Sequence, residues 1–189
     1  MLAGFIWWRR RPQRLPEFVA PVVDRTVEKP VLKLDISALR LDRSLMNATV
    51  SYRIAVRNPS TRAVSGLNIE ADLSSAAQGQ SQQGQLASPH QPLPPCHTAE
   101  RIAPGGSLRF EGQLRLSLSQ AAIVRQGNIA LLIPLMRVRA TADGLDPVAK
   151  TLVIGQGSGE RPQPLRLDEP PRSYAPPAQR LLDSAPDAA

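Results

Sequence analysis

A strict alternation of apolar and polar residues runs through the middle of the chain. It is clearest in NATVSYRIAVR, residues 47–57, where every second side chain is apolar or aromatic. This period of two is typical of a β-strand that buries one face and exposes the other. The Asn58-Pro59-Ser60 sequence that follows predicts a turn. The side chains predicted to face the core are Ala48, Val50, Tyr52, Ile54 and Val56.

Further alternating segments predict strands before and after this one. They are VLKLDI (31–36), GLNIEADL (66–73) and the segment that follows the Pro104-Gly105-Gly106 turn. Gly112 interrupts the last of these, which predicts a β-bulge or the close approach of another part of the chain. The inward positions are predicted to be Leu32, Leu34 and Ile36, then Leu67, Ile69, Ala71 and Leu73, and finally Leu108, Phe110, Leu114 and Leu116.

An apolar run and a turn predict the last pair of strands. The run NIALLIPLMRVRATAD, residues 128–143, contains Pro134. Because proline cannot donate to a sheet ladder, this residue predicts an edge strand or a bulged one. Asp143-Gly144 is a typical hairpin turn, and PVAKTLVIG (147–155) is the predicted return strand.

The whole pattern predicts an all-β protein that forms an antiparallel β-sandwich. Six or seven strands follow one another at even spacing, with almost no helical periodicity. The length of 189 residues suits one domain with tails. Aromatic residues make up only 4% of the chain, so the core must depend on Leu, Ile, Val and Ala. We place the sandwich at residues 31–155.

Three polar or proline-rich segments are predicted to lie outside the sandwich core. Residues 15–30 mix prolines and charges without a period and are predicted to be a linker. Residues 74–101 are rich in Gln, Ser, Gly and Pro, which predicts a long polar loop that hangs free of the sheets. The Pro- and Ala-rich residues 156–189 are predicted to be a mostly disordered tail, since they bury too little apolar surface to offset the entropy of ordering.

Residues 1–14, MLAGFIWWRRRPQR, are predicted to be a hydrophobic and basic membrane anchor. Tryptophan prefers the membrane–water interface, and arginine accumulates on the cytoplasmic flank of a span. A span takes about 20 apolar residues, which leaves two interpretations. The segment is either the end of a longer helix that starts before Met1 or a short interfacial anchor. The predicted anchor residues are Phe5, Ile6, Trp7, Trp8, Arg9, Arg10 and Arg11.

Charge and cysteine content add to this prediction of location. The net charge is +7, and a basic balance favours anionic membranes or nucleic acid as partners. The positive-inside rule places the β-domain on the cytoplasmic side of the inner (cell) membrane, with a single-pass or peripheral anchor. The single cysteine, Cys96, excludes a disulfide within the chain.

Two stretches carry a resemblance to known modules. SYRIAVRNPSTRAVSGLNIEADL and IAPGGSLRFEGQLRL resemble bacterial immunoglobulin-like modules of the CARDB or adhesion type, in which an asparagine turn ends one strand and a Pro-Gly turn introduces a later one. Residues 5–175 also resemble a family of uncharacterised bacterial membrane proteins with a helix that ends in Trp, a basic cluster, one sandwich and a segment like PLRLDEPPRSY. The resemblance implies an immunoglobulin-like sandwich and no activity, and this chain differs in its short apolar run.

Three local patterns in the sequence bear on possible sites of chemistry. Cys96-His97, with His90 nearby, falls short of structural zinc, which takes four ligands and spaces paired ones by two or more residues. GQGSG (155–159) follows a strand as in a dinucleotide-binding fingerprint, but Glu160-Arg161-Pro162 stands where the helix must begin. Asp168 and Glu169 point to opposite sides of an extended chain. We therefore predict no catalytic residue, no cofactor and no metal.

These observations lead to a hypothesis and an alternative. The hypothesis is a non-catalytic, membrane-associated binding or scaffolding module, which contacts lipid through its N-terminus and a protein partner through sheet edges or the polar loop. The alternative is a soluble basic protein that binds nucleic acid or anionic surfaces non-specifically. Specific nucleic-acid recognition is not predicted, because the strand aromatics Tyr52 and Phe110 both fall on the inward face.

Overall fold

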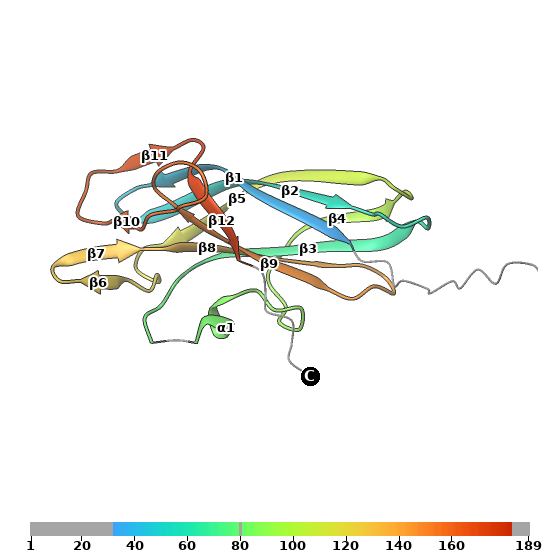
Figure 1. The fold of residues 1–189 in the computed structure, drawn as a ribbon, viewed down its shortest axis with the longest axis horizontal. Helices are drawn as coiled ribbons and strands as arrows, with labels where there is room; N and C mark the ends of the chain where they lie inside the picture. The colour runs from blue at the N-terminus through green and yellow to red at the C-terminus, as the bar shows by residue number, and fades with distance from the viewer. Residues whose placement is uncertain (1–31, 80, 183–189) are drawn as a thin grey trace, which may run out of the picture.

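Antiparallel β-sheets make up the computed structural model, which describes residues 32–79 and 81–182 (Figure 1). The first sheet has the order β11-β1-β2-β5 and the second sheet the order β12-β9-β8-β3-β4. These two sheets lie face to face, and a small third sheet with the order β10-β7-β6 lies at one end (Figure 1). The predicted all-β fold with antiparallel sheets is confirmed.

The strand bounds show how the chain passes between the sheets. The first sheet contains β1 (Lys33–Arg43), β2 (Asn47–Arg57), β5 (Ser107–Ser117) and β11 (Arg172–Tyr174). The second contains β3 (Val64–Ser75), β4 (Pro95–Ile102), β8 (Pro134–Thr141), β9 (Val148–Gly155) and β12 (Ala178–Leu182). The third contains β6 (Val124–Gln126), β7 (Ile129–Leu132) and β10 (Leu165–Arg166), and a single helical turn, α1 (Gln82–Gln85), follows β3.

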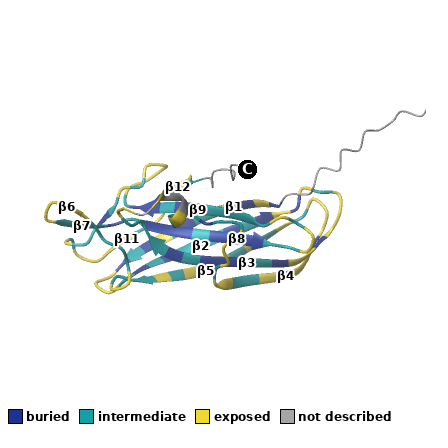
Figure 2. Cartoon of the chain, turned by 90° about the horizontal axis from the view of Figure 1, so that it is seen from below, coloured by how far each residue is buried: buried dark blue, intermediate teal, exposed yellow. Residues whose placement is uncertain are grey.

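The core lies between the two larger sheets and follows the predicted alternation (Figure 2). Every predicted inward residue of β2 is buried, with at most 2% of its surface exposed. The predicted inward residues of β3 are buried as well, whereas those of β5 are only half-buried. The buried residues of β2 and β3 are Ala48, Val50, Tyr52, Ile54, Val56, Leu67, Ile69, Ala71 and Leu73.

The turn after β2 is built around a fully buried asparagine. The Asn58 side chain donates to the carbonyl oxygen of Arg62 at 2.7 Å and to that of Ala103 at 3.2 Å. Its amide oxygen accepts from the backbone N–H and the hydroxyl of Ser60. Asn58 therefore ties the β2–β3 connection to the chain that enters β5, and the turn predicted at this position is confirmed.

Pro134 marks neither an edge strand nor a bulged one, contrary to the sequence-based expectation, since β8 pairs on both sides without a register shift. The apolar run divides at Ile133 into β7 of the third sheet and β8, which lies between β9 and β3 in the second sheet. Pro134 is the first residue of β8, where a missing donor disturbs the ladder least. The hairpin predicted at Asp143-Gly144 does connect β8 to β9.

The prediction of a disordered tail is wrong for residues 156–182. β11 pairs with β1, β12 pairs with β9, and β10 pairs with β7. Leu165 and Ala178 are buried in these strands, so the segment adds apolar surface to the core that composition alone did not reveal. The buried Arg43 donates to the carbonyl oxygens of Glu169 and Pro170 and fixes the approach to β11.

The predicted membrane anchor, Phe5 to Arg11, and the predicted linker lie outside the described residues. Within residues 32–79 and 81–182, no helix has both the length and the apolar character required to cross a bilayer.

Candidate functional site: the open edge of the first sheet

β5 is a long edge strand with one free side. It pairs with β2 over its whole length without a register shift, from Ser107 opposite Arg57 to Ser117 opposite Asn47. No described strand pairs with its other side. An edge of this length is unusual, because natural proteins commonly shorten, bulge or cover such strands to prevent pairing with other chains. The free side of β5 is therefore the candidate binding surface.

Two hydrogen bonds at the ends of β5 determine which backbone groups are free. The carbonyl oxygen of Gly106 accepts from the N–H of Asn58, and the N–H of Leu118 donates to the carbonyl oxygen of Met46. Hydrogen-bonded pairs recur at every second residue of an antiparallel ladder. The even-numbered residues of β5 therefore bond to β2. Its odd-numbered residues direct their N–H and C=O groups to the free side.

The outward side chains of β5 form a charged and polar row. Glu111 forms an ion pair with Arg53 of β2 at 2.7 Å. Arg109 and Arg115 lie two and four residues away along the strand, on the same face and exposed, with no carboxylate partner among the described residues. Ser107 and Gln113 complete the row. Lys33 and Arg57 extend this basic surface across β1 and β2.

The inner side of β5 is tied to the second sheet by a partly buried polar contact. The Tyr52 hydroxyl lies 2.9 Å from Nε2 of His97 on β4, and the His97 ring stacks on Phe110 at 5.1 Å between ring centroids. Gly112 is opposite Tyr52, and a Cβ there would lie 2.5 Å from the Tyr52 hydroxyl. The close approach predicted for Gly112 is confirmed, and the ladder has no bulge at this position.

Cys96 and His97 do not act together in this cluster. The Cys96 thiol donates to the carbonyl oxygen of Ile69 at 3.3 Å, whereas His97 faces Tyr52. Burial raises the pKa of the Cys96 thiol, which favours the protonated and unreactive form. Burial also raises the pKa of Tyr52. Among the described residues, no three His, Cys, Asp or Glu side chains are grouped so that they could hold a metal ion.

The half-buried position of His97 predicts a pH-dependent stability. Burial lowers the pKa of His97, so this side chain takes up a proton on unfolding, and the free energy of unfolding decreases as pH falls through the unfolded-state value of about 6.5. We expect urea titrations at pH 7.5 and pH 5.5 to show this loss. The His97→Gln variant, which cannot titrate, is expected to lose less, and an equal loss in both proteins would contradict the assignment.

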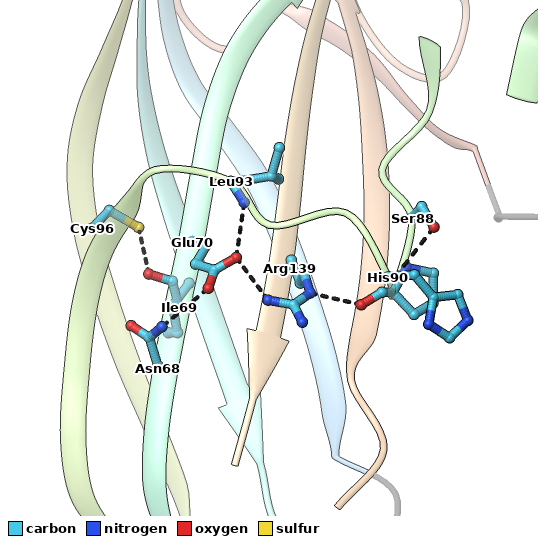
Figure 3. Close-up of polar contacts among 9 residues, drawn as sticks. Asn68, Ile69, Glu70, Ser88, His90, Leu93, Cys96 and Arg139 are labelled. Atoms are coloured by element: carbon cyan, nitrogen blue, oxygen red, sulfur yellow. Dashed lines mark hydrogen bonds and ion pairs between the residues drawn. The ribbon is translucent and has the colours of Figure 1, made fainter. Parts of the chain in front are cut away.

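The outer face of the second sheet is covered, in contrast to that of the first. Residues 76–79 and 81–94 are here called the strap, and Figure 3 shows its part from Ser88 to Leu93 crossing this face. Glu70 of β3 accepts from the N–H of Leu93 and from Nη1 of Arg139, both at 2.9 Å. Arg139 in turn donates to the carbonyl oxygen of Pro89 at 2.7 Å. Glu70 and Arg139 therefore hold the strap at two points, the N–H of Leu93 and the carbonyl oxygen of Pro89.

The expectation that residues 74–101 hang free is therefore wrong for their described part. The buried hydroxyl of Thr151 accepts from the N–H of Ala87 at 2.7 Å, which fixes the middle of the strap. Residues 95–101 belong to β4. Outward side chains of the sheet hold the strap by hydrogen bonds to its backbone N–H and C=O groups. Every residue type carries these backbone groups, so the polar composition of the strap did not indicate that it is ordered.

The strap also borders an apolar cavity of about 230 Å³, whose lining includes Leu86, Leu135 and Val153. Among the described residues that line it, Gln85 alone has a polar side chain, and this side chain is bonded to the backbone of Ala77 through both its amide oxygen and its amide nitrogen. Binding pockets usually present a few convergent polar groups that orient a ligand. This cavity lacks them, and the β5 edge is the better candidate.

The remaining predicted patterns have structural roles. Gly155 is the last residue of β9. A Cβ at this position would lie 2.2 Å from the carbonyl oxygen of Gln163, because Gln163 forms an isolated β-bridge with the next residue, Gln156. Asp168 forms an exposed ion pair with Arg166 at 2.7 Å, and this hydrogen bond lowers the pKa of Asp168. Neither arrangement resembles a nucleotide site or an acid–base pair. Comparisons with models of known protein families, with characterised proteins and with solved structures gave no match.

Proposed function

We propose that this protein is a non-catalytic binding or scaffolding module that works at the inner cell membrane. The observation that carries the proposal is the free side of β5, which offers unpaired backbone groups and a row of half-buried apolar side chains. Such an edge can accept an extended segment as an additional strand, with backbone hydrogen bonds for affinity and side chains for specificity.

The strand order supports an immunoglobulin-like sandwich. The first, second and fifth long strands lie in the first sheet, and β3, β4, β8 and β9 lie in the second. Immunoglobulin-type folds divide their strands between two sheets in a similar way. These folds serve mainly as rigid carriers of binding surfaces, and function is determined by the surface rather than by the fold.

The membrane part of the proposal rests on the sequence of the first residues. Phe5 to Trp8 provide apolar and aromatic side chains for the bilayer interface, and Arg9 to Arg11 provide positive charge for anionic headgroups. With this anchor the β-domain lies on the cytoplasmic side. The basic outer face of the first sheet would add to the attraction for an anionic surface.

Flotation with vesicles tests the proposal. We expect the full chain to float with vesicles that contain about one-third anionic lipid, and the Trp7→Ala/Trp8→Ala variant to remain mostly at the bottom of the gradient, because partition of the aromatic rings is lost. Arg53→Ala on the β-domain is the matched control and is expected to float like the unmodified protein. Equal flotation of the tryptophan variant would overturn the anchor.

Non-specific binding of nucleic acid or other anionic surfaces is a second candidate, favoured by Arg57, Arg109 and Arg115 on the open face of the first sheet. It predicts retention on a phosphate matrix that falls steeply with salt. The two candidates differ in their dependence on the N-terminus. Deletion of residues 1–14 abolishes flotation under the first candidate and leaves retention unchanged under the second.

A further inference from the structure

The free side of β5 is complementary to itself. We propose that a second copy of this chain occupies it, with the two β5 strands antiparallel and Gln113 of one copy opposite Gln113 of the other. This inference rests on the proposed function and names the partner of the same surface. The four-stranded first sheets of the two copies then form one continuous sheet across the contact.

The outward row of β5 matches its own charges in this register. Glu111 of each copy lies opposite Arg115 of the other, so the contact contains two pairs of opposite charge. Arg109 lies opposite Ser117, and the two Gln113 amides face each other. Each of these residues is an odd-numbered residue of β5. Its backbone N–H and C=O groups therefore point toward the other copy and form the hydrogen-bonded pairs of the new ladder.

The inward row brings apolar side chains together. Leu114 of one copy lies opposite Gly112 of the other, where Tyr52 occupies the place of the missing side chain. Phe110 lies opposite Leu116. These side chains are only half-buried in a single copy, because β5 has no neighbour on its free side. Pairing therefore removes apolar surface from water as well as satisfying backbone groups.

The other registers lack this match of opposite charges or place like charges together. A register centred on Leu114 pairs Arg115 with Gln113 and Glu111 with Ser117, so it contains no pair of opposite charges. With Gly112 at the centre, the two strands overlap along their whole length, but Arg109 then lies opposite Arg115 in both halves of the contact. With Glu111 at the centre, the two Glu111 carboxylates face each other. Like charges directly opposite each other destabilise a strand pair. A register centred on Phe110 also pairs Arg109 with Glu111, but it places the two Phe110 rings opposite each other and leaves Leu114 and Leu116 outside the contact.

Disulfide crosslinking of the full chain in mild detergent tests the register. In a Cys96→Ala background, Gln113→Cys brings the two thiols into a hydrogen-bonded pair with Cα atoms about 5.5 Å apart, which a disulfide can span. In the matched Glu111→Cys control the corresponding atoms are offset by four residues, or about 14 Å, which a disulfide cannot bridge. We expect a covalent dimer from the first variant on mild oxidation and little from the second.

Sedimentation velocity over a range of concentrations tests the dimer without crosslinks. We expect Arg115→Glu to raise the dissociation constant about tenfold or more, because two attractive pairs become repulsive. Gln113→Pro is expected to abolish the dimer, since it removes an N–H on the free side and leaves the β2–β5 ladder intact. Gln113→Thr is the control for Gln113→Pro, and unchanged melting temperatures establish that the variants are folded.

The outcomes separate this inference from the proposed function. A protein that stays monomeric at all concentrations, or that crosslinks through Glu111→Cys rather than Gln113→Cys, overturns the pairing proposed here. If that monomer still floats with vesicles, the membrane-associated module is retained and another protein segment occupies the edge. A dimer that does not float has the opposite meaning, since it supports the pairing and overturns the anchor.

Discussion

Replacement of Arg139 by alanine is expected to lower the free energy of unfolding by about 3 kcal/mol, the cost of leaving a buried ionised partner uncompensated. The side chains of Arg139 and Glu70 are only 15% and 10% exposed, and the pair holds the strap at Pro89 and Leu93. The substitution removes the ion pair and one strap contact and leaves the Glu70 carboxylate with two neutral donors. Urea denaturation monitored by circular dichroism measures the loss.

Arg53→Ala is the matched control for this substitution. Arg53 also pairs with a glutamate on a neighbouring strand, but the two side chains are 42% and 55% exposed. Exposed pairs of this kind contribute about 1 kcal/mol or less. Limited proteolysis within the strap provides a second measurement, since cleavage there should accelerate only in Arg139→Ala. Equal destabilisation by the two substitutions would show that the strap does not depend on the Glu70–Arg139 pair.

The second large effect is expected at Asn58. Asn58 itself is fully buried, and Asn58→Ala removes the hydrogen bonds of its side chain to the carbonyl oxygens of Arg62 and Ala103 and from the N–H of Ser60. A hydrogen bond contributes a net of about 0.5–1.5 kcal/mol, so we expect the loss of these bonds together to cost about 3 kcal/mol. Thermal unfolding would show it as a large decrease in Tm.

Asn58→Asp gives this prediction a distinctive pH dependence. The carboxylate keeps the acceptor for Ser60 but faces carbonyl oxygens where the amide nitrogen donated, so ionisation is disfavoured and the pKa of the introduced group is raised in the folded state. The protonated form can donate one hydrogen bond. Stability of this variant should therefore increase as pH falls from 7 toward 5. A variant that loses stability over the same range would contradict the proposed role of the Asn58 amide.

The alternation of residues predicted those parts of the fold that depend on local pattern. In β2 and β3, one face packs on the core and the other carries polar residues, so a period of two identifies each strand and its inward side chains. Asn58-Pro59-Ser60 and Asp143-Gly144 predicted their turns because those residues favour turn conformations on their own. Gly112 was identified as a close approach, although its neighbour, Tyr52, was not.

The remaining features depend on contacts between distant parts of the chain. Glu70 and Arg139 occupy outward positions of their strands. From the alternation alone, such charged residues look like part of a solvent-exposed face, and it is the strap that shields them from solvent. The candidate site has the same limitation, because strand order decides that β5 is an edge and that β8 is not. The charges of β5 were visible in the sequence. Their alignment with a second β5 could not be predicted, because it depends on which residues of β5 direct their backbone groups to the free side.

The C-terminal strands have a consequence for the order in which the protein can be completed during synthesis. β11 closes one side of the first sheet against β1, and β12 closes one side of the second against β9. Both strands follow the other strands of the two large sheets along the chain, so neither sheet reaches its full width until the residues up to Leu182 have left the ribosome. Until then, nascent chains expose β1 and β9 as temporary edges, which are vulnerable to pairing with other chains.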